Sequence, residues 1–244
     1  MLIVRHQFSP IILGVRKALS VVDWVVLRVV GLEHYAHLEP VQVDEGYLST
    51  LAKRWDPDRG TFQFPIGEMT VTLEDVYHIF RVSVEGERIH MGQDMEEAME
   101  GYFGDEWRSV MVTSGGFYYL DLYVSRDIPA LDTMVMFLLA NVLVPNSLGC
   151  RFPWNMLGVV AGMIGESRVY AWASDLLAEL YMELYEVRRR GRRGLGVSVI
   201  LQIWGWEHIA IARPLGLPSG RWDRQQAYAI WWVAMEETHP ILVM

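Results

Sequence analysis

The stretch Thr61–Gly86, TFQFPIGEMTVTLEDVYHIFRVSVEG, constrains the fold more than any other part of the chain. Two short runs of alternating apolar and polar residues flank the Pro65–Gly67 turn, which predicts a β-hairpin near residues 61–72. Thr72 and Asp75 resemble a capping box, in which the Thr side chain accepts a hydrogen bond from a free backbone N–H, so we expect a helix to begin there. None of these residues forms a recognisable catalytic arrangement, so we interpret the stretch as a structural element.

The rest of the chain favours helices, because apolar residues recur at helical spacing. Ser114–Val124 suits either a strand or a helix. No internal repeat or low-complexity linker divides the sequence, so we expect a mainly α fold, in one compact multi-helix domain over residues 1–244 with the short hairpin. The expected helices are Val15–Val30, Asp44–Trp55, Asp94–Phe103, Leu131–Val144, Tyr170–Val187, Val199–Ala212 and Arg224–Met235.

The composition excludes some functional classes. Cys150 is the single cysteine, which excludes disulfide scaffolds and multi-cysteine zinc sites and indicates a reducing compartment. The net charge of −9 argues against non-specific nucleic-acid binding by the whole surface. A hydrophobic share of 52%, with ten Trp and eleven Tyr, indicates a thick core, a partner-binding surface, or both.

We expect neither a membrane span nor a signal peptide. The most apolar run, Leu131–Val144, is interrupted by Asp132 and Asn141 and is shorter than the roughly 20 residues that a spanning helix needs. The N-terminus is apolar but lacks a small-residue cleavage site.

Residues 61–76, TFQFPIGEMTVTLEDV, resemble the signature of the plant mobile domain family, the family of MAIN and MAIN-like proteins. The signature reads W-x-P, then TF-x-x-P-x-GE-x-T-x-TL-x-DV, and Trp55 and Pro57 are placed accordingly. Further blocks follow in the family's order, so the resemblance covers roughly residues 31–222. These blocks are Trp172–Ser174 with Leu177–Ala178 and Leu180–Tyr181, Leu201–Glu207 with Arg213–Pro214, and Arg221–Trp222.

The chain also departs from the family pattern. Arg81 and Ser83 replace a Gly and a Pro that usually follow the capped helix, and the family's later W-x-PY ending is absent. The second departure indicates a C-terminus that is shortened or divergent.

The resemblance implies a transposon-derived nuclear protein, linked to transposable-element silencing and genome stability. It also implies a phosphatase-7-like partner. The family is sometimes labelled aminotransferase-like, but a pyridoxal-phosphate enzyme needs a Schiff-base lysine and a phosphate-binding loop. Lys17 and Lys53 are the only lysines and neither has such surroundings, so we expect no cofactor.

We weighed a metal site at His34 and His37, which lie one helical turn apart and are flanked by Glu33 and Glu39. No third ligand can be identified from the spacing, so the interpretation is that these are ordinary surface or interface residues. The chain has no HExxH, GxSxG or GxxxxGK[ST] motif, and we expect no enzyme activity.

Glu68 and Asp75 could form an acid–base pair. Their positions, in a turn before a strand and in the first turn of a helix, favour a structural role in which they accept hydrogen bonds from backbone N–H groups.

Trp172, Trp204 and Trp206 are candidate interaction or signature residues, with Gln202 and Glu207. The last two interrupt an otherwise apolar helix, so if buried they need partners, and we expect them to tie this helix to another segment. Arg54, Arg81 or Arg213 could pair with Glu207.

One dense basic run remains, with Arg188, Arg189, Arg190, Arg192 and Arg193 around Gly191. It could bind nucleic acid or serve in nuclear import, or it could be a solvated loop between two helices. The leading hypothesis is a non-catalytic nuclear interaction module whose partner is phosphatase-7-like or a second copy. The alternative is a nucleic-acid-binding accessory protein of a mobile element.

Overall fold

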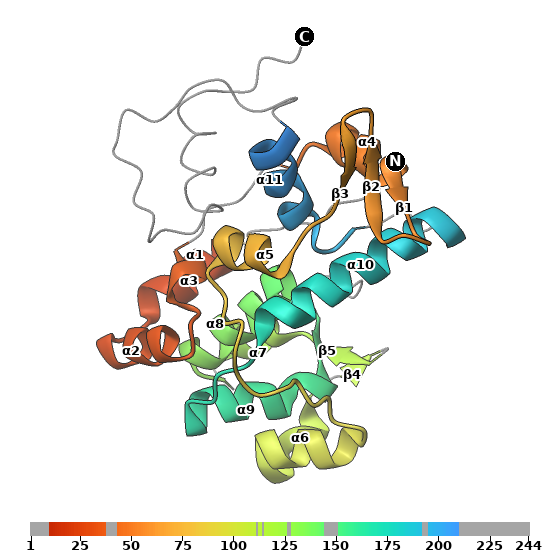
Figure 1. The fold of residues 1–244 in the computed structure, drawn as a ribbon. Helices are drawn as coiled ribbons and strands as arrows, with labels where there is room; N and C mark the ends of the chain where they lie inside the picture. The colour runs from red at the N-terminus through yellow and green to blue at the C-terminus, as the bar shows by residue number, and fades with distance from the viewer. Residues whose placement is uncertain are drawn as a thin grey trace. The chain divides into compact units, whose positions relative to one another are not determined.

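The computed structural model of the chain describes residues 10–37, 43–110, 112–113, 115–125, 128–143, 151–191 and 195–209. The chain divides into two units. The hairpin unit comprises Met1–Gln7, His37–Val84 and Ala173–Met244, and the α8 unit comprises Phe8–Ala36 and Glu85–Trp172. Each is mainly helical with one small antiparallel sheet, which confirms the predicted fold class (Figure 1). The single domain over 1–244 stays a prediction.

The hairpin unit has one sheet, in the order β1-β2-β3, and four helices among its described residues. Its elements are α4 (Glu45–Arg54), β1 (Trp55–Asp56), β2 (Thr61–Phe64), β3 (Gly67–Met69), α5 (Leu73–Phe80), α10 (Trp172–Arg190) and α11 (Ser198–Ile209).

The α8 unit is built around a buried helix and has the sheet order β4-β5-β6. Its helices are α1 (Pro10–Ala18), α2 (Val21–Val29), α3 (Glu33–Ala36), α6 (Met95–Phe103), α7 (Tyr119–Ser125), α8 (Ala130–Leu138) and α9 (Leu157–Glu166). Its other elements are β4 (Val112–Thr113), β5 (Gly116–Phe117), β6 (Phe152–Pro153), the 3-10 turns Gly104–Ser109 and Trp154–Met156, and the π turn Leu139–Leu143.

The predicted hairpin and capped helix are present. β2 pairs with β3 in the register Phe62 to Met69, and β1 extends the sheet by pairing with β2. The Thr72 side chain accepts a hydrogen bond from the Asp75 N–H at 3.2 Å, and the Asp75 carboxylate accepts one from the Thr72 N–H at 2.7 Å. Both bonds of the capping box are therefore made, with Asp in the place of the usual Glu or Gln.

Several expected helix boundaries were wrong. The predicted helix over Val15–Val30 is two helices, because Ser20 caps a new one. The Ser20 side chain accepts from the Asp23 N–H at 3.2 Å, and the Asp23 carboxylate accepts from the Ser20 N–H at 2.7 Å. The ambiguous stretch from Ser114 contains both a strand, β5, and a helix, α7. The helix predicted over Arg224–Met235 lies outside the described residues.

Aromatic rings fill the centre of the hairpin unit. Phe62 contacts Trp55 and Trp204, with ring centroids 4.8 and 5.0 Å away, and Trp55 contacts Tyr181 at 5.1 Å. These four side chains come from β1, β2, α10 and α11, so one aromatic cluster joins the sheet to two helices.

α4 and α11 pack closely because Gly205 has no side chain. A Cβ at this position would lie 2.4 Å from the Tyr47 hydroxyl oxygen and 3.0 Å from Leu51. Burial, followed by the charge of Asp44, raises the pKa of Tyr47 to about 12, so its hydroxyl is protonated at neutral pH. That hydroxyl is buried and has no hydrogen-bond partner among the described residues.

We expect Gly205→Ala to destabilise the hairpin unit by about 2 kcal/mol, because the added methyl overpacks this contact. Tyr47→Phe alone should change stability by less than about 0.5 kcal/mol, since no described hydrogen bond is lost. Tyr47→Phe should recover part of the loss when combined with Gly205→Ala. A double-mutant cycle from urea denaturation measures the coupling, and additive effects would contradict the proposed clash.

Arg81 ends α5 in the left-handed conformation, with φ 55° and ψ 26°. Its N–H donates to the Tyr77 carbonyl at 2.6 Å, and its guanidinium lies 4.9 Å from the centre of the Tyr77 ring. This is the position at which the family pattern has Gly, and left-handed backbone favours Gly because it has no Cβ.

We therefore expect Arg81→Gly to be more stable than Arg81→Ala by about 1 kcal/mol, because both variants lose the guanidinium and only Ala keeps the Cβ strain. Thermal and urea denaturation of the two variants test this difference. Equal stability, or a more stable Ala variant, would show that the backbone here is unstrained.

Helix α8 forms the core of the α8 unit. Its residues Leu131 and Thr133–Leu138 are buried, and it packs against α1 and α9. In α9, a Cβ at Gly162 would lie 2.7 Å from the Tyr170 hydroxyl, whereas a Cβ at Gly158 would meet no atom within 4 Å. No helix among the described residues combines the length and apolar character needed to cross a membrane.

Candidate functional site

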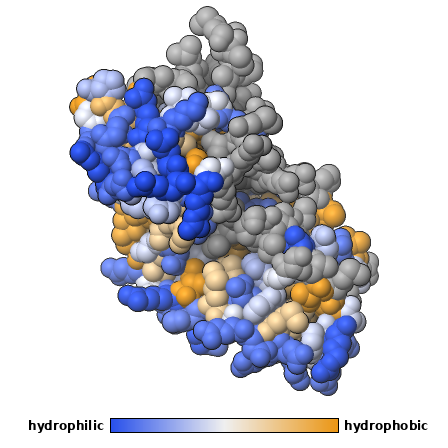
Figure 2. Space-filling view, turned by 90° about the vertical axis from the view of Figure 1, so that its right-hand side faces the viewer, coloured by the Kyte–Doolittle hydropathy of each residue, from blue (hydrophilic) through white to orange (hydrophobic). Residues whose placement is uncertain are grey.

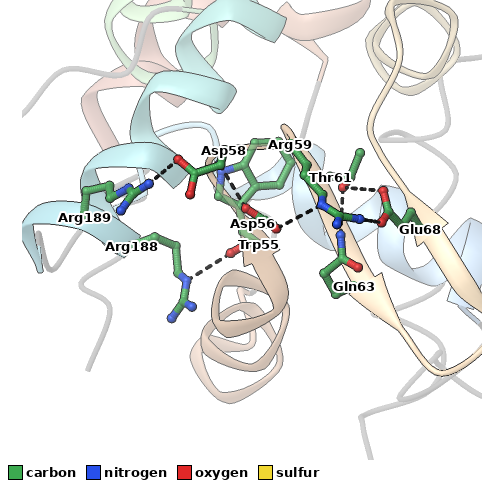
Figure 3. A network of polar contacts seen from close by, with 9 residues as sticks. All are labelled: Trp55, Asp56, Asp58, Arg59, Thr61, Gln63, Glu68, Arg188 and Arg189. Carbon is green, nitrogen blue, oxygen red and sulfur yellow. Dashed lines mark hydrogen bonds and ion pairs between the residues drawn. The ribbon is translucent and has the colours of Figure 1, made fainter.

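A cluster of charged and polar side chains surrounds the start of the hairpin, where α4 leads into β1 and a turn (Figure 3). The turn is shaped by Asp56, whose carbonyl accepts from the Gly60 N–H at 2.9 Å and whose carboxylate accepts from the Asp58 N–H at 2.9 Å. Gly60 adopts φ 66°, which allows the chain to reverse into β2. This turn places Asp56, Asp58 and Arg59 side by side.

Glu68, one of the predicted site residues, belongs to this cluster. It forms an ion pair with Arg59 and accepts a hydrogen bond from the Thr61 hydroxyl at 3.3 Å. Arg59 also lies 3.7 Å from the Asp56 carboxylate. Glu68 therefore joins β3 to the turn before β2.

Two of the predicted arginines, Arg188 and Arg189, reach the same region from α10. Arg188 donates to the Trp55 carbonyl at 3.0 Å, and Arg189 forms an ion pair with Asp58 (Figure 3). Arg190 pairs with Glu186 one turn earlier, at 3.0 Å. Arg188, Arg189 and Arg190 form the last turn of α10, where the helix dipole favours cations. Arg192 and Arg193 lie outside the described residues.

A cleft of about 590 Å³ opens beside these side chains. Its basic lining residues are Lys53, Arg54, Arg188 and Arg189, against the acidic Asp56 and Asp58. Arg54 donates to the Gln63 carbonyl at 3.2 Å and lies 5.4 Å from the centre of the Phe64 ring. The ion pair at this cleft, Arg189–Asp58, is exposed, and such pairs contribute only about 0–1 kcal/mol, so Arg189 can exchange its partner for an anion.

Asp75, the other predicted carboxylate, lies elsewhere in the hairpin unit. One of its oxygens completes the capping box with Thr72, and the other lies 2.9 Å from Nε2 of His208 in α11. Asp75 therefore accepts a hydrogen bond from a backbone N–H, whereas Glu68 contacts the side chains of Arg59 and Thr61.

Trp204, Trp206 and Gln202 lie on the buried part of α11, and Trp172 is also buried. Gln202 accepts a hydrogen bond from the Asp44 N–H at 2.7 Å, which ties α11 to the start of α4 as a buried polar side chain requires. Glu207 is partly exposed, and its side chain or backbone interacts with another group of the protein. The three tryptophans therefore stabilise the interior and do not form an accessible contact surface.

One important residue, Glu183, was not predicted. It is 2% exposed, and its carboxylate accepts from the Gly196 N–H at 2.7 and 2.8 Å and from the Val197 N–H at 3.1 Å. Glu183 lies four residues after Glu179, on the same face of the helix. The segment directly before α11, 13–14 residues further along the chain, makes Glu183 a buried capping residue.

His34 and His37 are the histidines of the candidate metal site considered from the sequence. Both side chains are exposed, and the neighbouring Glu33 forms a two-bond ion pair with Arg28, at 2.7 and 2.6 Å. In the part of the chain that the structure describes, no group of three or more His, Cys, Asp or Glu side chains could hold a metal ion.

The sequence matches one protein family and several plant proteins. The profile of one family, described as plant mobile domain, matches residues 31–241. Protein MAIN-LIKE 2 of Arabidopsis thaliana is 24% identical over 200 residues, which is 75% of this chain and 30% of the relative. Protein MAINTENANCE OF MERISTEMS of the same plant is 22% identical over 220 residues, covering 81% of this chain and 43% of the relative.

A third relative is named serine/threonine-protein phosphatase 7 long form homolog, also from Arabidopsis thaliana. It is 25% identical over 224 residues, or 81% of this chain and 16% of the relative. The chain thus spans less than half the length of each of these relatives. No solved structure matches it.

Proposed function

Because this chain belongs to the plant mobile domain family, we propose that it is a non-catalytic protein-interaction module of transposon origin. It acts in the nucleus, in transposable-element silencing and genome maintenance, and its partner is a phosphatase-7-like protein or a second copy of itself. The relative named serine/threonine-protein phosphatase 7 long form homolog supports that class of partner.

The observation that carries the proposal is an exposed apolar face on α2. Val21, Val22, Val25 and Val29 are 83%, 70%, 51% and 51% exposed, and their spacing places them along one side of the helix. Other hydrophobic residues also lie at the surface among hydrophilic ones, as Figure 2 shows. A contiguous apolar helix face is typical of a protein contact.

The polar contacts of the hairpin unit support a non-catalytic role. Glu68 pairs with Arg59, Asp58 pairs with Arg189, and Asp75 holds Thr72 and His208. A general acid or base needs access to a substrate proton, and these carboxylates are already used to hold one segment to another.

Affinity purification of the tagged full chain from plant nuclei, followed by mass spectrometry, tests the proposal. The wild type should enrich a phosphatase-like protein or untagged copies of itself, with and without nuclease. Val22→Glu/Val25→Glu should lose that partner, because two charges on the contact face oppose its burial. Ile66→Glu is the control, since Ile66 is 82% exposed but lies in the hairpin turn.

Two results would contradict this function. One is the absence of any enriched protein partner that survives nuclease. The other is full retention of the partner by the α2 double variant, with unchanged folding by circular dichroism. Fluorescent fusions in plant cells test the nuclear location, and exclusion of the full chain from nuclei would contradict it.

The basic lining of the cleft supports a second candidate function, nucleic-acid binding. Lys53, Arg54, Arg188 and Arg189 meet there, and cations of this kind bind phosphates with an affinity that falls as salt rises. In fluorescence anisotropy with single-stranded RNA and duplex DNA, Arg188→Ala/Arg189→Ala should weaken binding and reduce its salt dependence. Salt-dependent binding that survives replacement of all five arginines of the 188–193 run would remove that run from the explanation.

A further inference from the structure

Two pockets, of about 490 and 420 Å³, lie beside α6 and α9 in the α8 unit and share Gly101, Tyr102 and Ala161 in their lining. We call the two pockets together the α6–α9 groove. This groove is a different surface from the valine face of α2 and from the cleft of the hairpin unit, and the proposed function does not use it.

Small residues keep the groove open. Gly158, Ala161 and Gly165 follow one another at steps of three and four, so they lie on one face of α9, and all three are exposed. A Cβ at Gly158, Gly165 or Gly101 would meet no atom within 4 Å. An extended chain can therefore approach the α9 backbone along this face.

The larger pocket combines apolar walls with the Asp132 carboxylate. Phe103, Leu122, Ile128 and Ile164 line it, together with Asp132. The Tyr102 hydroxyl donates a hydrogen bond to Asp132. Burial raises the pKa of Asp132, and the hydrogen bond from Tyr102 acts in the opposite direction. The Asp132 carboxylate is thus partly desolvated with a neutral donor beside it, and a cation would be a better partner.

Other acidic side chains give the rest of the groove the same negative charge as Asp132. Asp94 and Glu97 line the smaller pocket and Glu106 lines the larger one, whereas no Lys or Arg lines either pocket. A basic ligand matches this lining, and nucleic acid is repelled by it.

We infer that the α6–α9 groove binds a lysine- or arginine-containing peptide segment of a partner protein. One basic side chain enters the larger pocket, where its aliphatic stem packs on Leu122 and Ile164 and its cation pairs with Asp132. Long basic side chains suit such a site, because their stems are apolar and only their tips are charged. The neighbouring residues of the peptide lie over the small face of α9, toward Asp94 and Glu97. This goes beyond the proposed function, because it concerns a different surface and names the chemistry of the ligand.

Fluorescence anisotropy with the full chain tests the inference. The probe is a fluorescein-labelled peptide of alternating Arg and Ala, and a peptide of alternating Gln and Ala is the uncharged comparison. Asp132→Asn keeps the shape and an acceptor for Tyr102 but removes the charge, and it should weaken binding at least about tenfold. Ala161→Leu fills the shared middle of the groove and should weaken binding by a similar factor without removing any charge.

Glu100→Gln is the matched control. Glu100 is exposed on α6 and lines neither pocket, so its loss should change the affinity by less than about twofold. The inference is overturned if the Arg peptide does not bind saturably. It is equally overturned if Ala161→Leu binds as tightly as the wild type, because the attraction would then be a general effect of the net charge. If Asp132→Asn does not fold, Ala161→Leu decides the question.

Discussion

Glu183→Ala is expected to destabilise the hairpin unit by about 3 kcal/mol. The substitution removes a buried carboxylate that accepts hydrogen bonds from the Gly196 and Val197 N–H groups. Buried N–H groups that lose their acceptor cost about 1–3 kcal/mol each, less whatever water can enter to replace the bond. Urea denaturation followed by tryptophan fluorescence is a suitable measurement, because Trp204 and Trp206 lie in α11, directly after the capped segment.

Two further variants separate the capping role of Glu183 from its volume and helix position. Glu183→Gln keeps one acceptor oxygen and should lose about half as much stability as Glu183→Ala. Glu179→Ala removes a carboxylate one turn away on α10 and should cost less than about 0.5 kcal/mol. If Glu179→Ala and Glu183→Ala have equal effects, the loss reflects helix α10 in general and the capping role is refuted.

Gly86→Ala is expected to destabilise the α8 unit by about 3 kcal/mol or more. Gly86 has φ 149°, and a Cβ would lie 2.6 Å from the Val169 carbonyl oxygen and 2.7 Å from the Tyr170 carbonyl carbon. These are backbone atoms, so they cannot turn away as a flexible side chain can. The next residue, Glu87, pairs with the same segment through bonds of 2.9 Å to Val169 and 3.1 Å to Ala171. Relief of the clash would have to break this pairing.

Thermal denaturation and amide hydrogen exchange can both measure the effect. Exchange at Glu87 and Ala171 should accelerate in the Gly86→Ala variant, because their N–H groups make the bonds that the methyl displaces. Gly14→Ala is the control in the same unit, since Gly14 lies in helix α1 and faces open space. It should stabilise the protein by up to about 1 kcal/mol. A Gly86→Ala variant as stable as the wild type would show that the two segments separate without cost.

The predictable parts of the fold were those specified by neighbouring residues. The hairpin over β2 and β3 and the Thr72–Asp75 capping box depend on contacts within a few residues, and both were predicted from the sequence. The prediction of one helix over Val15–Val30 was wrong, although the residues that divide it are also close together in the sequence. Ser20 and Asp23 form a second capping box, which divides the expected helix Val15–Val30 into α1 and α2.

The candidate site was predictable only in part, because its members come from distant segments. Glu68, Arg188 and Arg189 were singled out from the sequence, but their pairing with Arg59, Trp55 and Asp58 was not predicted. Glu183 shows the same limit: its sequence context matches that of Glu179, and only one of the two lies beside the start of α11.

The sequence alone determined the family, the mainly helical class and the stretch Thr61–Gly86, because family signatures, helical periodicity and caps are written in residues close together along the chain. The tertiary structure decided which polar and aromatic residues are buried, which charges pair, and where a groove stays open along α9. These properties depend on which surfaces are removed from water when distant segments pack together. Asp44 and Gln202, for example, are more than a hundred residues apart, and no pattern of neighbouring residues predicts their contact.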